Sequence, residues 1–314
     1  MSIAFTFPGQ GSQAVGMGKA LADAFPQAAA VFAEVDEALS QKLSVLMFEG
    51  PEADLTLTAN AQPALMAVSL AVVRVLEAEA GLDLARDAQF VAGHSLGEYS
   101  ALAAAGSFSL ADTARLLRQR GEAMQKAVPV GQGAMAALLG LDYETGVAVA
   151  AEAAGANDVC QIANDNGGGQ VVASGHKAAV ERAVEIAKAK GARRALMLPV
   201  SAPFHCALMQ PAADAMREAL ASVTVRAPKV PLVANVLAAP ISEPDEIRNR
   251  LVEQVTGTVR WRESVAYMAS EGVTTFYELG AGKVLSGLVK RIAEGASGIA
   301  IGQPVDIETF KSRP

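Results

Sequence analysis

The residues best able to do chemistry in this chain form a pentapeptide, Gly-His-Ser-Leu-Gly, at positions 93–97. A short apolar run precedes it at residues 89–92, and an alanine-rich pattern typical of a helix follows it. This arrangement predicts a nucleophile elbow, the sharp strand-to-helix turn that exposes one serine hydroxyl above a sheet. Gly93 and Gly97 fit such a turn because side chains there would collide with the neighbouring strand and helix. The competing interpretation is a glycine-bounded helix start in which Ser95 has no chemical role.

A serine hydroxyl needs a base within hydrogen-bond reach to act as a nucleophile at neutral pH. Of the three histidines, His94 adjoins the serine and should point away from it, and His176 opens a polar helix where a solvent-exposed role is expected. His205 lies in a proline-rich loop between a strand and a helix, where a rigid frame can present a catalytic side chain. We predict His205 as the base, the alternative being a helix-capping histidine. Its neighbour Cys206 is interpreted as a small apolar packing residue.

Two glycine-rich segments could in principle bind phosphate. Residues 9–14 match the dinucleotide pattern G-x-G-x-x-G/A between a strand and a helix. No second strand ending in an acidic residue follows, because Glu34 and Asp36 fall within a helical pattern. The glycines at 167–169 lack a following Lys-Ser/Thr and are interpreted as a hairpin turn. We therefore expect no bound nucleotide cofactor.

The elements that must position these residues alternate between strands and helices, which predicts an α/β fold with a parallel, helix-covered sheet. From about residue 133 to 199 the order changes to β-α-β-β-α-β, the ferredoxin-like unit. We predict a large α/β-hydrolase-like domain built from residues 1–128 and 200–314, with a small ferredoxin-like subdomain inserted at 129–199. A ligand is expected in the cleft between the two bodies.

The composition narrows the class of protein. The 314 residues carry a formal net charge of −7, which argues against nonspecific nucleic-acid binding. No apolar stretch is expected to reach the ~18 residues that span a membrane, because Arg74 interrupts the most apolar helix. The beginning of the chain has no basic segment typical of a signal peptide. With only Cys160 and Cys206, no disulfide framework is expected, and a reducing cytoplasm fits best.

Several short motifs follow one another along the chain: Phe7-Pro8-Gly9-Gln10-Gly11-Ser12-Gln13, Gln62-Pro63-Ala64-Leu65, residues 93–101, Gln119-Arg120-Gly121, Phe204-His205 and Tyr277-Glu278-Leu279-Gly280. In this order and spacing they resemble the family of acyl-carrier-protein S-malonyltransferases. The resemblance runs from about residue 3 to residue 302. One departure is Ala281, where relatives usually have proline between two glycines.

The resemblance implies catalytic roles for particular residues. Ser95 would be the acylated nucleophile and His205 its base. The main-chain carbonyl of Gln254, rather than a carboxylate, would orient the imidazole, although Asp158 and Asp165 remain available as carboxylates.

The resemblance also implies the residues that bind the acyl group. The backbone N–H groups of Gln10 and Leu96 would form the oxyanion hole. Arg120 would bind the free carboxylate of malonate, and a planar guanidinium suits this task because it can hold a carboxylate through two parallel hydrogen bonds. Phe204, together with Leu96, matches the pattern that selects malonyl over methylmalonyl groups, because a bulky ring would crowd a branch at the α-carbon.

The implied function is a two-step transfer of malonyl from malonyl-CoA to the phosphopantetheine thiol of acyl carrier protein, through a malonyl-serine ester. The product would feed fatty acid or polyketide synthesis, and neither a metal nor a redox cofactor would be needed. We expect a cytoplasmic monomer whose partners are the carrier protein and the coenzyme A thioester. The rivals are a serine hydrolase and a carrier-protein scaffold with an inactive site. An α/β-hydrolase places its histidine near the end of the chain, whereas 109 residues follow His205 here.

Overall fold

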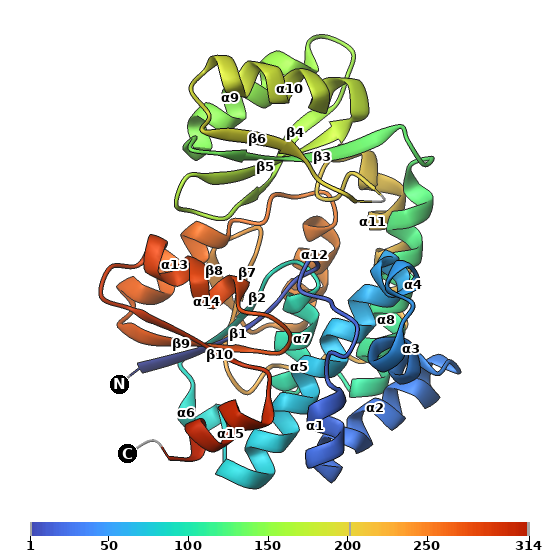
Figure 1. Cartoon of the computed structure of the whole chain (residues 1–314), viewed down its shortest axis with the longest axis vertical. Helices are drawn as coiled ribbons and strands as arrows, with labels where there is room; N and C mark the ends of the chain where they lie inside the picture. Colours follow the sequence, from blue (N-terminus) through green and yellow to red (C-terminus); the bar gives the residue numbers. More distant parts are fainter. Residues whose placement is uncertain (1, 201, 313–314) are drawn as a thin grey trace.

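Two β-sheets organise the chain, in a computed structural model that describes residues 2–200 and 202–312 (Figure 1). The large sheet has six strands in the order β10-β9-β1-β2-β7-β8. All of its described pairings are parallel except the one between β7 and β8. The strand bounds are β1 (Ser2–Phe7), β2 (Phe90–Gly93), β7 (Leu232–Ala234), β8 (Ala239–Ile241), β9 (Val273–Leu279) and β10 (Ser297–Ile301). The parallel sheet that the strand–helix alternation predicts is confirmed.

Alternate side chains of the central strands enter two separate apolar cores, because successive residues of a strand point to opposite faces. Phe5, Phe7 and Val91 pack on one face against the core that includes α5 (Thr58–Ala80), α7 (Gly97–Ala104) and α8 (Leu110–Ala127). Ala4 and Ala92 pack on the other face against α13 (Trp261–Ser270) and α14 (Val284–Ile292). Helices therefore cover both faces of the large sheet, as parallel sheets require.

The remaining helices of the large body lie mostly on the side of α5. Their bounds are α1 (Lys19–Ala24), α2 (Pro26–Leu39), α3 (Leu43–Glu49), α4 (Glu52–Thr56), α6 (Leu84–Asp87), η1 (Ala207–Met209), α11 (Gln210–Ala221), α12 (Pro244–Gln254) and α15 (Pro304–Lys311). The expectation that no apolar stretch is long enough to span a membrane is wrong. Helix α5 is long and apolar enough to do so by length and composition, despite Arg74. In the structure 83% of its apolar window is buried. Its apolar surface is therefore used to pack the core.

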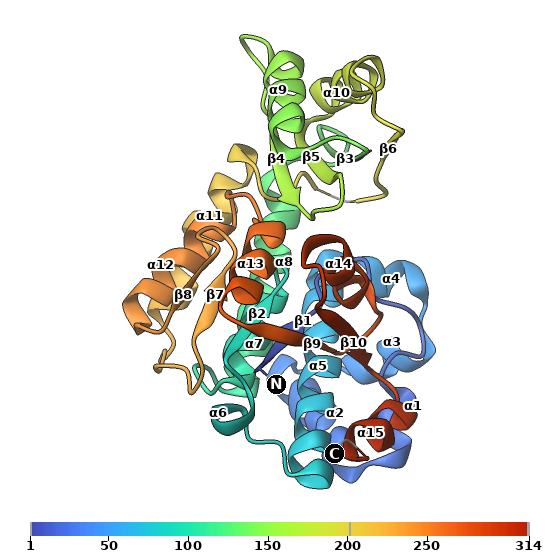
Figure 2. The same ribbon diagram turned by 90° about the vertical axis from the view of Figure 1, so that its left-hand side faces the viewer.

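The small sheet is antiparallel, with the order β4-β5-β3-β6. Its strands are β3 (Gly133–Leu139), β4 (Cys160–Asp165), β5 (Gln170–His176) and β6 (Arg194–Met197), and its helices are α9 (Tyr143–Ala154) and α10 (Lys177–Ala189). This order and direction are those of the ferredoxin-like unit, as expected. Both views show the small sheet with α9 and α10 at the end of the molecule away from the two termini (Figures 1 and 2). The boundaries after residues 128 and 199 stay a prediction.

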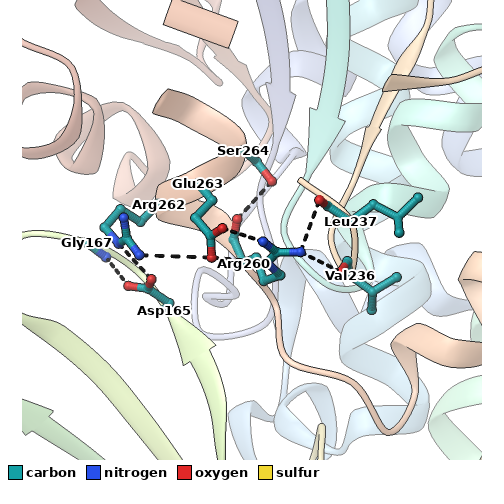
Figure 3. Close-up of polar contacts among 8 residues, drawn as sticks. All are labelled: Asp165, Gly167, Val236, Leu237, Arg260, Arg262, Glu263 and Ser264. Carbon is teal, nitrogen blue, oxygen red and sulfur yellow. Dashed lines mark hydrogen bonds and ion pairs between the residues drawn. The ribbon is translucent and has the colours of Figure 1, made fainter. Parts of the chain in front are cut away.

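A polar junction joins the β4–β5 hairpin to the start of α13 (Figure 3). The buried Asp165 carboxylate accepts a hydrogen bond from Arg262 Nε at 2.7 Å and one from the Gly167 N–H at 3.3 Å. Arg260 forms an ion pair with Glu263 and donates to the main-chain oxygens of residues 236–237. The same hairpin therefore contacts the large body through charged side chains right beside the cleft.

Candidate active site

Ser95 sits on a strained turn between β2 and α7. Its φ is 54°, in the left-handed region that a non-glycine residue rarely adopts. A Cβ added to Gly93 would lie 1.9 Å from the Gly97 carbonyl carbon, and a Cβ added to Gly97 would lie 2.2 Å from Phe7 O. Neither position tolerates a side chain, as the nucleophile-elbow interpretation requires.

His205 reaches the serine from the loop after β6. Its Nε2 lies 2.7 Å from Ser95 Oγ, and its Nδ1 lies 2.8 Å from the main-chain oxygen of Gln254. Because a carbonyl oxygen only accepts, Nδ1 carries the hydrogen and Nε2 is left with the lone pair that can take the serine proton. Burial, followed by the charge of Arg120, lowers the pKa of His205 to about 3. The imidazole is therefore neutral at physiological pH and ready to act as a base.

Arg120 completes the contacts of the serine oxygen from α8. The residue is only 1% exposed, and its Nη2 donates to Ser95 Oγ at 3.1 Å and to Gln254 Oε1 at 2.8 Å. Its Nη1 donates to Gln62 Oε1 at 2.7 Å, and its Cζ lies 5.6 Å from the ring centroid of Tyr99. Among the described residues, no carboxylate lies within 4.0 Å of its guanidinium nitrogens. The site therefore holds a buried cation whose acceptors are all neutral.

Two amide side chains hold the elbow from behind. Asn235 Oδ1 accepts from the Ser95 N–H at 2.8 Å, and its Nδ2 donates to Gly93 O at 2.7 Å. Gln254 Nε2 donates to Ser95 O at 2.9 Å. The main-chain oxygen of the same glutamine orients His205, so Gln254 touches the serine, the histidine and Arg120.

The cleft that contains these groups lies between the two bodies and has a volume of about 540 Å³. Gln10, Leu96 and Phe204 line it, together with Ser95 and residues of the small sheet. Among the described residues, neither the Gln10 N–H nor the Leu96 N–H donates to a protein acceptor. The Gln10 loop approaches the elbow so closely that a Cβ at Gly9 would lie 2.7 Å from the main-chain oxygen of residue 94. Both N–H groups are thus free to bind an oxyanion beside the serine.

The other sequence candidates lie outside this constellation. His94 is half-buried, and its Nε2 lies 2.9 Å from Asn166 Oδ1 in the small subdomain. His176 accepts from a backbone N–H within the small subdomain and is partly exposed. Cys206 is fully buried, with its Sγ donating to a backbone carbonyl.

The two carboxylates that could have oriented His205 have other partners. Asp158 pairs with Arg182, and Asp165 pairs with an arginine at the junction described above. Neither aspartate contacts His205.

Sequence reasoning assigned no role to Gln62, Asn235 or Glu98, all of which are buried around the serine and Arg120. Gln62 and Glu98 lie within the quoted motifs, so the signal was present for them. Asn235 follows a short strand with no distinctive pattern. No cluster of three or more His, Cys, Asp or Glu side chains suited to a metal occurs in the part of the chain that the structure describes.

Proteins whose elbow serine contacts a histidine in this way form acyl esters on the serine oxygen. Fold and site thus define a protein of the serine acyl-transfer class. The family described as "Acyl transferase domain" matches residues 4–301, and the chain belongs to this family.

Individual relatives agree with this assignment. The chain is 48% identical over 306 residues to the malonyl CoA-acyl carrier protein transacylase of Bacillus subtilis (strain 168), covering 98% of this chain and 95% of that protein. The crystal structure of acyl-carrier-protein-S-malonyltransferase from Bartonella henselae is 60% identical, with a TM-score of 0.96 and 98% of each chain covered. A chain of the structure described as a type II PKS acyl-carrier protein in complex with its malonyl-transacylase also matches, at 42% identity, a TM-score of 0.95 and 99% coverage of each chain.

Proposed function

We propose that this protein transfers the malonyl group from malonyl-CoA to the phosphopantetheine thiol of acyl carrier protein, through a malonyl ester on Ser95. One observation carries the proposal: Ser95 Oγ lies within hydrogen-bond distance of both a neutral imidazole and a buried guanidinium. The imidazole supplies a base for ester formation, and the guanidinium supplies a partner for a carboxylate on the acyl group. The names of the relatives point to the same substrates.

In the first half-reaction, His205 Nε2 takes the Ser95 proton as Oγ attacks the thioester carbonyl. The oxyanion that forms accepts hydrogen bonds from the N–H groups of Gln10 and Leu96, each contributing on the order of 3 kcal/mol to the transition state. The imidazolium then returns its proton to the sulfur as the C–S bond breaks and coenzyme A leaves. Malonyl-serine remains.

In the second half-reaction, the phosphopantetheine thiol of the carrier protein enters the same cleft. His205 takes the thiol proton, the sulfur attacks the ester carbonyl, and the oxyanion again uses the two backbone donors. Collapse of the tetrahedral intermediate breaks the C–O bond, and the proton on His205 returns to Ser95 Oγ. The enzyme is regenerated, so the kinetics are of the ping-pong type.

Arg120 selects the acyl group by its charge. A malonyl group brings a carboxylate that can pair with the buried guanidinium, whereas an acetyl group leaves the cation without an anionic partner. A buried charge that is left without its partner costs about 3–5 kcal/mol relative to the paired state. Phe204 lines the same cleft and limits the space for a branch at the α-carbon.

The direct test is incubation with radiolabelled malonyl-CoA and phosphopantetheinylated carrier protein. Transfer to the carrier protein supports the proposal, whereas release of free malonate indicates a hydrolase and an absence of both indicates a scaffold. Ser95→Ala should abolish the covalent malonyl adduct in mass spectra. Ser100→Ala is the matched control, because this buried hydroxyl on α7 has no hydrogen-bond partner among the described residues.

The remaining expectations belong to the same proposal. The product would supply malonyl units for fatty acid or polyketide synthesis. The protein would work as a monomer in the cytoplasm, without a metal or redox cofactor. The free thiols of Cys160 and Cys206 agree with a reducing compartment.

A further inference from the structure

Glu98 is a buried acid directly behind the site, and the mechanism above does not use it. It lies on the first turn of α7, is 1% exposed and does not line the cleft. Its Oε2 accepts a hydrogen bond from Gln254 Nε2, while its Oε1 has no hydrogen-bond partner within the described parts of the chain. A buried carboxylate with one unpartnered oxygen is disfavoured in its charged form. This burial raises the pKa of Glu98 to about 8.

The amide of Gln254 links this acid to Arg120. An amide has a donor end and an acceptor end, and Glu98 and the main-chain oxygen of Ser95 together fix which way it points, because both accept from the donor end. The acceptor end, Oε1, then faces Arg120 Nη2 at 2.8 Å. With the amide reversed, its NH2 group would face the donors of the guanidinium. Glu98 therefore helps to hold the guanidinium in place beside Ser95.

Among the residues that the structure describes, Arg120 is the one cation whose charge acts on Glu98. Tyr99, on the same helix, and Arg120, on α8, are the titratable groups that face the acid. His205 and His94 flank the serine, and burial lowers the pKa of both, so they are neutral. From α12 and the loop after β7, the facing groups are the uncharged amide of Gln254 and the main chain of Asn235. A substrate carboxylate on Arg120 would thus add a second acid next to one cation.

We propose that Glu98 is a positioning residue of the carboxylate site, which holds Arg120 through the Gln254 amide and must be uncharged when the malonyl carboxylate occupies Arg120. The proposal rests on the function proposed above. Two buried carboxylates that share one guanidinium repel each other, so arrival of the substrate favours the protonated form of Glu98. Malonyl-CoA binding therefore takes up a proton, whereas acetyl-CoA binding does not.

Proton uptake can be measured by calorimetry in buffers of different ionisation enthalpy at pH 8.5. The Ser95→Ala protein binds malonyl-CoA without turnover, and acetyl-CoA is the ligand without a carboxylate. We expect uptake of roughly half a proton or more with malonyl-CoA, close to none with acetyl-CoA, and none with malonyl-CoA once Glu98→Gln is added. Glu278→Gln is the matched control, since Glu278 is equally buried but accepts from the first turn of α14 and, within the described residues, does not interact with Arg120; proton uptake by the protein with this substitution should stay unchanged.

Steady-state kinetics give a second readout in which Ser95 is intact. Because malonyl-CoA binds the protonated form, its KM should rise roughly tenfold between pH 7 and pH 9, and Glu98→Gln should abolish this rise. A flat KM in the unaltered enzyme, or equal proton uptake with and without Glu98, overturns the proposal. If the unaltered enzyme forms a malonyl adduct but the Ser95→Ala protein shows no proton uptake, only this inference fails; if no adduct forms on the unaltered enzyme, the proposed function fails as well.

Discussion

Replacing Glu98 with glutamine should make the protein more stable at neutral and alkaline pH. The pKa of Glu98 is raised from 4.5 to about 8 by its burial. A raised folded-state pKa means that the carboxyl contributes fully to stability below pH 4.5, where both states are protonated. This contribution is lost as the pH rises through about 8, because only the unfolded chain ionises readily. Glutamine keeps the shape and an acceptor for Gln254 and never ionises.

The size of the effect follows from the same shift. A difference of about 3.5 pH units, at about 1.4 kcal/mol per unit, sets an upper bound of roughly 5 kcal/mol on the gain of Glu98→Gln over the unaltered protein between pH 4.5 and pH 8. Urea unfolding at pH 5, 6.5 and 8 measures it. Glu218→Gln, at an exposed position, serves as control, and its free energy of unfolding should differ from that of the unaltered protein by the same small amount at all three pH values. The reasoning is refuted if the difference between Glu98→Gln and the unaltered protein is equally independent of pH.

Three further substitutions follow from the geometry. Arg120→Ala should lower malonyl transfer by a factor of about 100 or more and reduce the preference over acetyl-CoA, as competition assays with both thioesters would reveal. Gly97→Ala should abolish soluble expression or activity because its Cβ would lie 2.2 Å from a main-chain oxygen, whereas Gly287→Ala, with no atom within 4 Å, should be neutral or stabilising in a thermal melt. Arg262→Ala should destabilise the protein by about 1–3 kcal/mol, since it leaves the buried Asp165 without its ion pair; denaturant titration would detect this loss.

Much of the fold could be predicted because its signals are local. The strand–turn–helix pattern around Ser95 and the β-α-β-β-α-β order of the small subdomain depend on neighbouring residues, and both are confirmed. The short strand β8 and the edge strand β10 were missed. β8 has only three residues. In β10, exposed residues alternate with half-buried ones, and there is no strong apolar run. Such strands are specified by their partners in the sheet rather than by their own sequence.

Some residues of the site could also be predicted from the sequence, and others could not. Ser95, His205 and Arg120 could be proposed because their residue types suit acyl transfer and the surrounding motifs resemble a known family. The supporting contacts of Asn235 and Glu98 could not be, although Glu98 lies within a quoted motif, because these contacts depend on which side chains meet across elements more than 100 residues apart. Burial of α5 was also invisible to the sequence, since core and membrane helices share the same composition.

The use of a main-chain carbonyl to orient His205 has an electrostatic reason. Serine hydrolases commonly place a carboxylate on this nitrogen, and it stabilises the imidazolium during catalysis. Here Gln254 presents its main-chain oxygen to His205 and its side chain to Arg120, so a permanent anion at this position would lie next to the guanidinium. That anion would compete with the acyl carboxylate for the buried Arg120 and weaken selection of a dicarboxylic substrate. A neutral carbonyl fixes the tautomer of His205 and leaves the charge of Arg120 for the substrate.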